Sequence, residues 1–177
     1  MEEGMITLTG QNNAGDNVTD VRPGPAGCKE AVKIQELKQI FPGNRTGAED
    51  FSPLVLAWIG DAVYGMIIRT LLISDGNMPV DRLNKKASRL VCAKAQADVI
   101  HVLMDDVLNE EEKVIFRRGR NAKSFSVAKN ASVTDYRHAT GMEALCGYLY
   151  LKDDINRLLY LLKEGLERSG LWDIMKH

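Results

Sequence analysis

Apolar residues recur every three or four positions over most of the chain beyond residue 30, which is the pattern of helices with one buried face. No proline follows Pro79 for 98 residues, and such a stretch suits long helices better than strands joined by turns. The pattern predicts helices over residues 30–40, 54–73, 79–106, 109–123, 134–151 and 153–168, the third of them broken once. We therefore expect an all-α fold.

Capping residues mark where several of these helices begin. Ser52 followed by Pro53 is a cap with proline at the first helical position, and Asn109 with Glu112 forms a capping-box pattern. After a polar loop over residues 124–133, Thr134 is expected to cap the next helix. The last helix has an apolar stripe that we expect to be buried: Ile155, Leu158, Leu159 and Leu162.

Residues 1–28 differ from the rest of the chain. They hold five of the fifteen glycines and two of the five prolines, and few apolar residues. Such a segment buries too little surface to offset its ordering entropy, so we expect a disordered tail. The remaining residues, 29–177, are expected to form one domain. The net charge of −1 favours no particular partner, although local charge does.

Cysteine usage and the N-terminus bear on location. Cys28, Cys92 and Cys146 are widely spaced and form no CxxC pair, which suits a reducing compartment and argues against a zinc site. Cys146 lies in an apolar stretch and is expected to be buried. The N-terminus lacks the pattern of a signal peptide, and we expect no apolar run to approach membrane-spanning length. We expect a cytoplasmic protein without membrane association.

Asp61 stands in an unusual place for a carboxylate. It is the only charged residue between Asp50 and Arg69, within a strongly apolar helix. An ionised carboxylate there is costly unless it is paired, hydrogen-bonded or bound to a cation. Its neighbour Gly60 is a poor residue for a helix interior, which suggests that another backbone or a ligand comes close.

Glu143 repeats this pattern in the helix predicted over 134–151. Small residues, Ala139 and Gly147, lie one turn on either side of it. We expect the two helices to pack together so that Asp61 and Glu143 meet, and two such carboxylates would raise a pKa or bind a cation, with Mg²⁺ the best match for hard oxygen ligands. The alternative is that each acid caps or salt-bridges a local group.

A basic tract runs from Lys113 to Arg137, in which Asp135 is the only acid. Such a local excess in a nearly neutral protein is typical of nucleic-acid binding, and the scarcity of aromatic residues favours backbone contacts to a duplex. The alternative is a solvated helix face. The candidate RNA-binding residues are Arg117, Arg118, Arg120, Asn121, Lys123, Lys129 and Arg137.

Four stretches, taken together, resemble the ribonuclease III family. Gly60-Asp61-Ala62-Val63 is similar to the end of the family signature, and Met142-Glu143-Ala144-Leu145 is similar to its second acidic motif. The stretches Arg117–Lys123 and Tyr136–Gly141 resemble the Mini-ribonuclease III subgroup closely. The likeness covers about residues 50–165, and four motifs in order are far more specific than one.

The resemblance implies a ribonuclease III-like helical fold, a homodimer, and metal-dependent endonucleolytic cleavage of double-stranded RNA. Asp61 and Glu143 would then be the catalytic and metal-binding acids, with Mg²⁺ activating a water and stabilising the leaving oxygen. For the Mini subgroup, the implied substrate is precursor ribosomal RNA, and the implied role is ribosome maturation. No separate RNA-binding domain is expected, so the catalytic domain would grip RNA alone.

The sequence also departs from the full family pattern. Leu54 and Ala57 stand where the signature usually has glutamates, and Thr140 stands where the second motif usually has an aspartate. The smaller acidic set keeps two alternatives open. One is a non-catalytic double-stranded RNA-binding module on the same fold, and the other is a helical interaction protein with no role in RNA.

Overall fold

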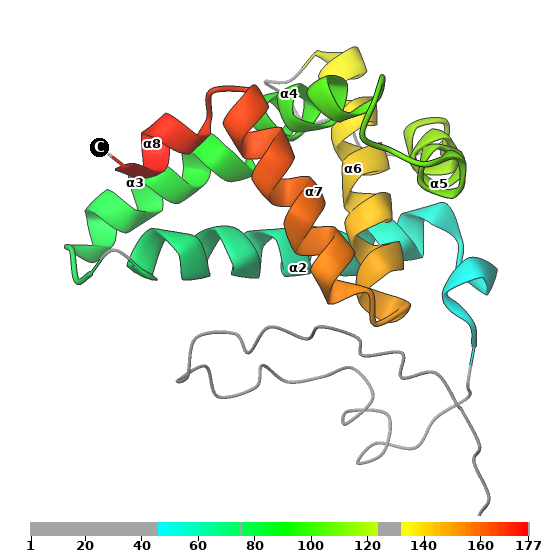
Figure 1. Ribbon diagram of the computed structural model, residues 1–177, viewed down its shortest axis with the longest axis horizontal. Helices are drawn as coiled ribbons and strands as arrows, with labels where there is room; N and C mark the ends of the chain where they lie inside the picture. Colours follow the sequence, from blue (N-terminus) through cyan, green and yellow to red (C-terminus); the bar gives the residue numbers. More distant parts are fainter. Residues whose placement is uncertain (1–45, 75, 124–131, 177) are drawn as a thin grey trace, which may run out of the picture. The chain divides into compact units, whose positions relative to one another are not determined.

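The computed structural model describes residues 46–74, 76–123 and 132–176 (Figure 1). Over these ranges the regular elements are all helices and no strand occurs, which confirms the all-α fold. The tail expected over 1–28 and the helix expected over 30–40 lie outside the described residues. The helices are η1 (Ala48–Asp50), α2 (Pro53–Ser74), α3 (Val80–Val91), α4 (Ala93–Leu103), α5 (Glu110–Arg120), α6 (Val133–Leu151), α7 (Ile155–Arg168) and α8 (Trp172–Lys176).

Two helix boundaries follow the sequence signals, and the one break expected in the third helix is present. Pro53 is the first residue of α2, and the Ser52 hydroxyl accepts a backbone N–H of its first turn at 3.3 Å. Asn109 and Glu112 form the capping box of α5, with both side-chain-to-backbone bonds at 2.9 Å. The break expected in the third helix lies at Cys92, whose extended backbone separates α3 from α4.

Two boundaries in the basic region were predicted wrongly. Helix α5 ends at Arg120 rather than Lys123, because the next N–H, that of Ala122, bonds to the carbonyl of Gly119 three residues back and the i to i−4 pattern stops. Helix α6 begins before Thr134, because Ser132 is the cap and its hydroxyl accepts the backbone N–H of Asp135 at 2.9 Å. Ser132 directly precedes the helix, and serine caps a helix at least as well as threonine.

The structure corrects two further expectations, one in α7 and one near the two ends of the described residues. Leu159 is 46% exposed, whereas Leu161 and Leu166 are buried, because α7 contacts α4 as well as α6 and so presents a different stripe. Helices η1 and α8 were not predicted. They have three and five residues, which is too short to show a helical period.

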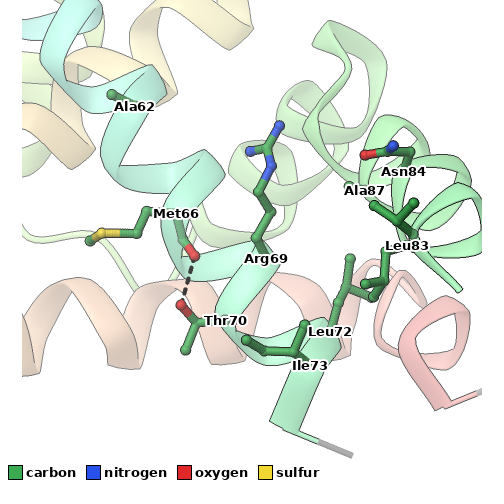
Figure 2. Close-up of a pocket in the computed structure, with 10 residues that line it drawn as sticks. Ala62, Met66, Arg69, Thr70, Leu72, Ile73, Leu83, Asn84 and Ala87 are labelled. Carbon is green, nitrogen blue, oxygen red and sulfur yellow. Dashed lines mark hydrogen bonds between the residues drawn. The ribbon is translucent and has the colours of Figure 1, made fainter. Parts of the chain in front are cut away.

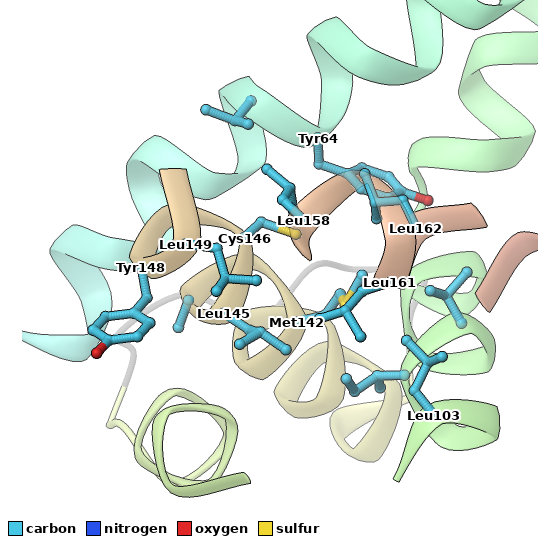
Figure 3. Close-up of a cluster of buried hydrophobic side chains, with 14 of the residues drawn as sticks. Tyr64, Leu103, Met142, Leu145, Cys146, Tyr148, Leu149, Leu158, Leu161 and Leu162 are labelled. Atoms are coloured by element: carbon cyan, nitrogen blue, oxygen red, sulfur yellow. The ribbon is translucent and has the colours of Figure 1, made fainter. Parts of the chain in front are cut away.

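Helix α6 forms the centre of the described structure. From Ala139 to Leu149 every residue is buried except the half-exposed Glu143, and α6 packs against α2, α4, α5 and α7. Figure 3 shows side chains of α6 and α7 gathered with Tyr64 of α2 and Leu103 of α4 in one core. A helix that is buried on all sides has no solvent-exposed face for charged residues, so a glutamate at position 143 is unusual there.

A buried ion pair ties α5 to α7. Glu112 is 2% exposed, and Arg157 donates to both its carboxylate oxygens, from Nε at 2.7 Å and from Nη2 at 2.9 Å. Arg157 Nη2 also donates to the carbonyl of Val107 at 2.7 Å. This geometry satisfies a carboxylate that burial would otherwise destabilise.

Helix α2 is buried on one side only. Its other side exposes a stripe of large apolar residues: Leu54, Val55, Trp58, Met66 and Ile73. By length and composition, its 22 residues are sufficient to cross a membrane, so the expectation that no apolar run approaches that length is wrong for this helix. The core helices of soluble proteins meet the same criterion, and α2 packs against α6, α3 and α5.

Candidate active site

Helices α2 and α6 cross with their backbones in contact, and two glycines make this possible. A Cβ atom at Gly60 would lie 1.8 Å from the carbonyl oxygen of Glu143, and one at Gly147 would lie 2.0 Å from that of Leu56. No residue with a side chain fits at either place. Because Gly60 adjoins Asp61, the crossing positions both acids along their helices, and the expected packing of these two helices is confirmed.

The two acids at the crossing have different environments. Asp61 is exposed, whereas Glu143 is half-buried in the otherwise buried face of α6. Burial, and secondly the negative charge of Asp61, raise the pKa of Glu143 to about 7. The Glu143 carboxyl therefore exchanges its proton near neutral pH, which makes it suited to acid–base work or to cation binding.

Gln96 of α4 lies against Glu143 and was not singled out from the sequence. Its side chain favours the ionised form of Glu143 and partly offsets the rise in pKa. It is 1% exposed, yet its Nε2 forms no full hydrogen bond within the described ranges. A buried donor without a partner costs about 1–3 kcal/mol, so a site that keeps one is organised for a further oxygen ligand or water.

The donor set fits a magnesium ion. Asp61 and Glu143 supply hard carboxylate oxygens, and Mg²⁺ typically takes one or two protein carboxylates while keeping several waters. In the part of the chain that the structure describes, no group of three or more His, Cys, Asp and Glu side chains could hold a metal. Any magnesium here would therefore rely on Asp61 and Glu143 and on water, with the Gln96 amide beside them.

Most of the candidate RNA-binding residues lie at the surface, in the last turn of α5, the residues after it and the start of α6. The exposed ones are Arg117, Arg118, Asn121, Lys123 and Arg137, while Arg120 is half-buried. Lys129 lies outside the described residues.

Two arginines of α5, Arg118 and Arg120, make long hydrogen bonds to neighbouring groups. Arg118 Nη2 donates to the carbonyl of Phe51 at 3.3 Å, and Arg120 Nε donates to Asn121 Oδ1 at 3.1 Å. The Arg120 guanidinium also lies 5.7 Å from the ring centre of Phe116. These contacts orient the cations and leave exposed N–H groups for a further anion.

His138 lies beneath this basic surface. Its Nδ1 is 2.9 Å from the carbonyl oxygen of Thr134, and its ring centre is 4.5 Å from that of His101. Burial, together with the nearby His101 and Arg120, lowers the pKa of His138. The ring is therefore neutral at pH 7 and packs among aromatic neighbours.

A groove of about 550 Å³ lies between α2 and α3 (Figure 2). It continues the exposed apolar stripe of α2 towards its C-terminal end. Arg69 Nη1 donates back to the carbonyl of Gly65 at 2.9 Å and the Thr70 hydroxyl to that of Met66 at 2.9 Å, so a local bond orients each of these polar side chains. The groove is lined mainly by apolar atoms from Ala62, Met66, Leu72, Ile73, Val80, Leu83 and Ala87.

Comparisons with known proteins identify the family to which this chain is similar. The family described as Ribonuclease III domain matches residues 54–154. The chain is 50% identical over 123 residues to a protein named Mini-ribonuclease 3 from Thermoanaerobacter sp. (strain X514), covering 70% of this chain and 86% of that one. It is also 50% identical to the Mini-ribonuclease 3 of Brevibacillus brevis, over 64% of this chain and 84% of that one. A crystal structure of a Fusobacterium nucleatum protein is similar with a TM-score of 0.61 and 32% identity, covering 67% of this chain and 94% of that one.

Proposed function

The chain belongs to the Mini-ribonuclease III group of the ribonuclease III family and is thus an endoribonuclease, and we propose that it cleaves double-stranded RNA with magnesium held by Asp61 and Glu143. The observation that carries this proposal is the α2–α6 crossing, where contact between two glycines and the opposite backbone brings these acids together. The near-neutral pKa of Glu143, about 7, is consistent with a carboxyl that meets a cation or a proton during the reaction.

The residues at the crossing have separable tasks in this proposal. Asp61 and Glu143 would hold the metal, which when bound supplies Lewis-acid stabilisation and an activated water. Gln96, buried beside Glu143, would orient that carboxylate. The exposed Asp61 is accessible to a polymer lying on the surface, as cleavage within a duplex requires.

Arg117, Arg118, Lys123 and Arg137 would grip the RNA by its phosphates, with Arg120 and Asn121 beside them. Their exposure supports this, because a duplex of RNA is recognised mainly through its backbone and shape. Contacts of this kind release counterions, so binding should weaken steeply as salt rises.

A second copy of the chain would cover the apolar stripe of α2. Trp58 is 78% exposed, and the groove of about 550 Å³ lies two turns further along the same helix. In a twofold dimer each copy presents the same surface, so Trp58 of each copy could fill the groove of the other. An exposed apolar surface of this kind marks an interaction site.

The cellular role is part of the same proposal. The relatives share the name Mini-ribonuclease 3, and the resemblance to that subgroup implies precursor ribosomal RNA as the substrate and a role in ribosome maturation. A cytoplasmic location without membrane association is consistent with this substrate and with the absence of disulfides among the described cysteines, Cys92 and Cys146.

Cleavage of a labelled duplex RNA tests the proposal. The wild type, Asp61→Asn and Glu143→Gln are compared with magnesium and with chelator, and Asp105→Asn, an exposed acid between α4 and α5, is the control. We expect only the wild type and the control to cut, and only with magnesium. If the wild type binds the duplex but does not cut it, the result favours the non-catalytic RNA-binding module instead. If Asp61→Asn still cuts the duplex, the site assignment is refuted.

A further inference from the structure

Helix α3 carries a row of cations that the basic tract of α5 and α6 does not include. Arg82, Lys85, Lys86 and Arg89 follow one another at intervals of three, one and three residues, so they share one face of the helix over roughly 10 Å. We call this the α3 basic face. The opposite side of α3 supplies Leu83 and Ala87 to the groove against α2, so the cations point away from that groove.

A hollow of about 500 Å³ lies along the α3 basic face, between α3 and α8. Lys86 Nζ donates to the carbonyl of Met175 at 3.1 Å and so connects the two helices. The hollow is lined by the four cations together with Asp173 and Ile174, so cations outnumber acids in its lining. Lys85 and Arg89 form no ion pair within the described ranges, so no protein carboxylate there accounts for them.

The α3 basic face is distant from the basic tract. In Figure 1 α3 and α5 lie towards opposite ends of α2, and α6 crosses α2 between them. The position of α3 is fixed, because the buried Tyr64 hydroxyl of α2 donates to the carbonyl of Leu90 at 2.9 Å. The two basic surfaces thus flank the crossing that holds Asp61 and Glu143.

We propose that the α3 basic face is a second binding site for the phosphate backbone of the duplex RNA, away from the cleaved bond. This inference rests on the proposed function, which supplies a polyanion longer than either basic surface. A row of Arg and Lys along a helix matches a row of phosphates, and the open hollow admits a sugar–phosphate strand between the cations. An acidic protein segment would satisfy the same charges, but nothing in the family's activity supplies one.

The test uses charge reversal at Lys85 and Arg89, the two cations of the α3 basic face that form no ion pair within the described ranges. The double variant Lys85→Glu/Arg89→Glu is compared with Lys163→Glu, an exposed cation on α7. Binding is measured by fluorescence anisotropy over a range of salt concentrations, with a short duplex that fills only the cleavage site and with a long duplex. Cleavage of both duplexes is measured in parallel, and circular dichroism checks the fold.

For the long duplex we expect on the order of tenfold weaker binding by the double variant, and a salt dependence flatter by one or two phosphate contacts. The short duplex should be bound and cleaved as by the wild type, and Lys163→Glu should change neither. Unchanged binding of the long duplex would overturn the inference and point to an acidic protein instead. If the wild type binds no duplex RNA at all, the proposed function itself is refuted. That result is distinguishable from one in which the wild type and the double variant bind the long duplex equally well, which refutes only the inference about α3.

Discussion

The carbonyl oxygen of Glu143 occupies the space that a side chain at Gly60 would need. A Cβ atom there would lie 1.8 Å from that oxygen, well inside van der Waals contact. The same backbone that carries the candidate acid on α6 therefore sets the closest approach of α2, and Asp61 is the next residue along that helix. Any change in this contact must move one acid relative to the other.

Gly60→Ala should destabilise the protein by about 3 kcal/mol or more, because the obstacle is backbone and cannot move aside. Gly65→Ala, five residues on in α2, is the matched control. A Cβ there meets only the end of the flexible Arg69 side chain, so the change should stay within about 1 kcal/mol. Urea unfolding measures both, and equal effects would contradict the contact.

Glu143→Gln should stabilise the metal-free protein at pH 8 by about 2 kcal/mol. Burial raises the pKa of Glu143 to about 7, so between pH 4.5 and 7 the folded state holds a proton that the unfolded state has lost. Stability therefore falls as pH rises through this window, and the glutamine removes that loss. Near pH 4.5 the variant and the wild type should unfold at almost the same denaturant concentration.

Glu111→Gln provides the contrast for this measurement. Hydrogen bonds from Lys152 and Tyr148 lower the pKa of Glu111, so its ionised form is favoured in the folded state. Its replacement should bring no stabilisation at pH 8. A stabilised Glu111→Gln, or a Glu143→Gln without gain, would show that the pH dependence has another origin.

Arg157→Met should cost about 3 kcal/mol, because it leaves the buried Glu112 carboxylate without its partner. Arg168→Met is the control, since Arg168 pairs with Asp106 and Glu164 at the surface, and little change is expected. Thermal unfolding compares the two. Adding Glu112→Met to Arg157→Met should recover part of the loss, which a purely steric role for Arg157 would not predict.

Trp58→Glu should convert the proposed dimer to a monomer while leaving helix content unchanged, because this side chain is 78% exposed in the single chain. Leu159→Glu, an exposed apolar residue on α7, should leave the assembly intact. Analytical ultracentrifugation at micromolar concentration decides between them. A monomeric wild type would refute the proposal that a second copy covers the apolar stripe of α2. A dimeric Trp58→Glu variant would show that the dimer interface lies elsewhere.

Much of the helical fold was predictable because its signals are local. The capping box of Asn109 with Glu112 and the Ser52-Pro53 start each depend on a few neighbouring residues, whereas the position of the break at Cys92 was not predicted. Cys146 is buried as its apolar context predicted. Leu159 was misplaced because the buried side of α7 depends on which helices surround it, which a single helix does not reveal.

The site was predictable in part. Small residues beside Asp61 and Glu143 indicated the helix crossing, since a glycine in a helix interior is costly without a close neighbour. Gln96 was overlooked because a single polar residue in an apolar helix has many explanations until its neighbour is known. The roles of the acids and of the basic tract stay predictions that the proposed cleavage and binding experiments test.

The close contact of α2 with α6 at Gly60 has a consequence for how the chain tolerates random mutation. Gly60 and Asp61 are adjacent, yet one is packed against the opposite backbone and the other is exposed. In a mutant library selected only for soluble, folded protein, substitutions at Gly60 should disappear while substitutions at Asp61 persist. Only selection for RNA cleavage should remove the latter, so two libraries would separate the requirements of the fold from those of the chemistry at neighbouring codons.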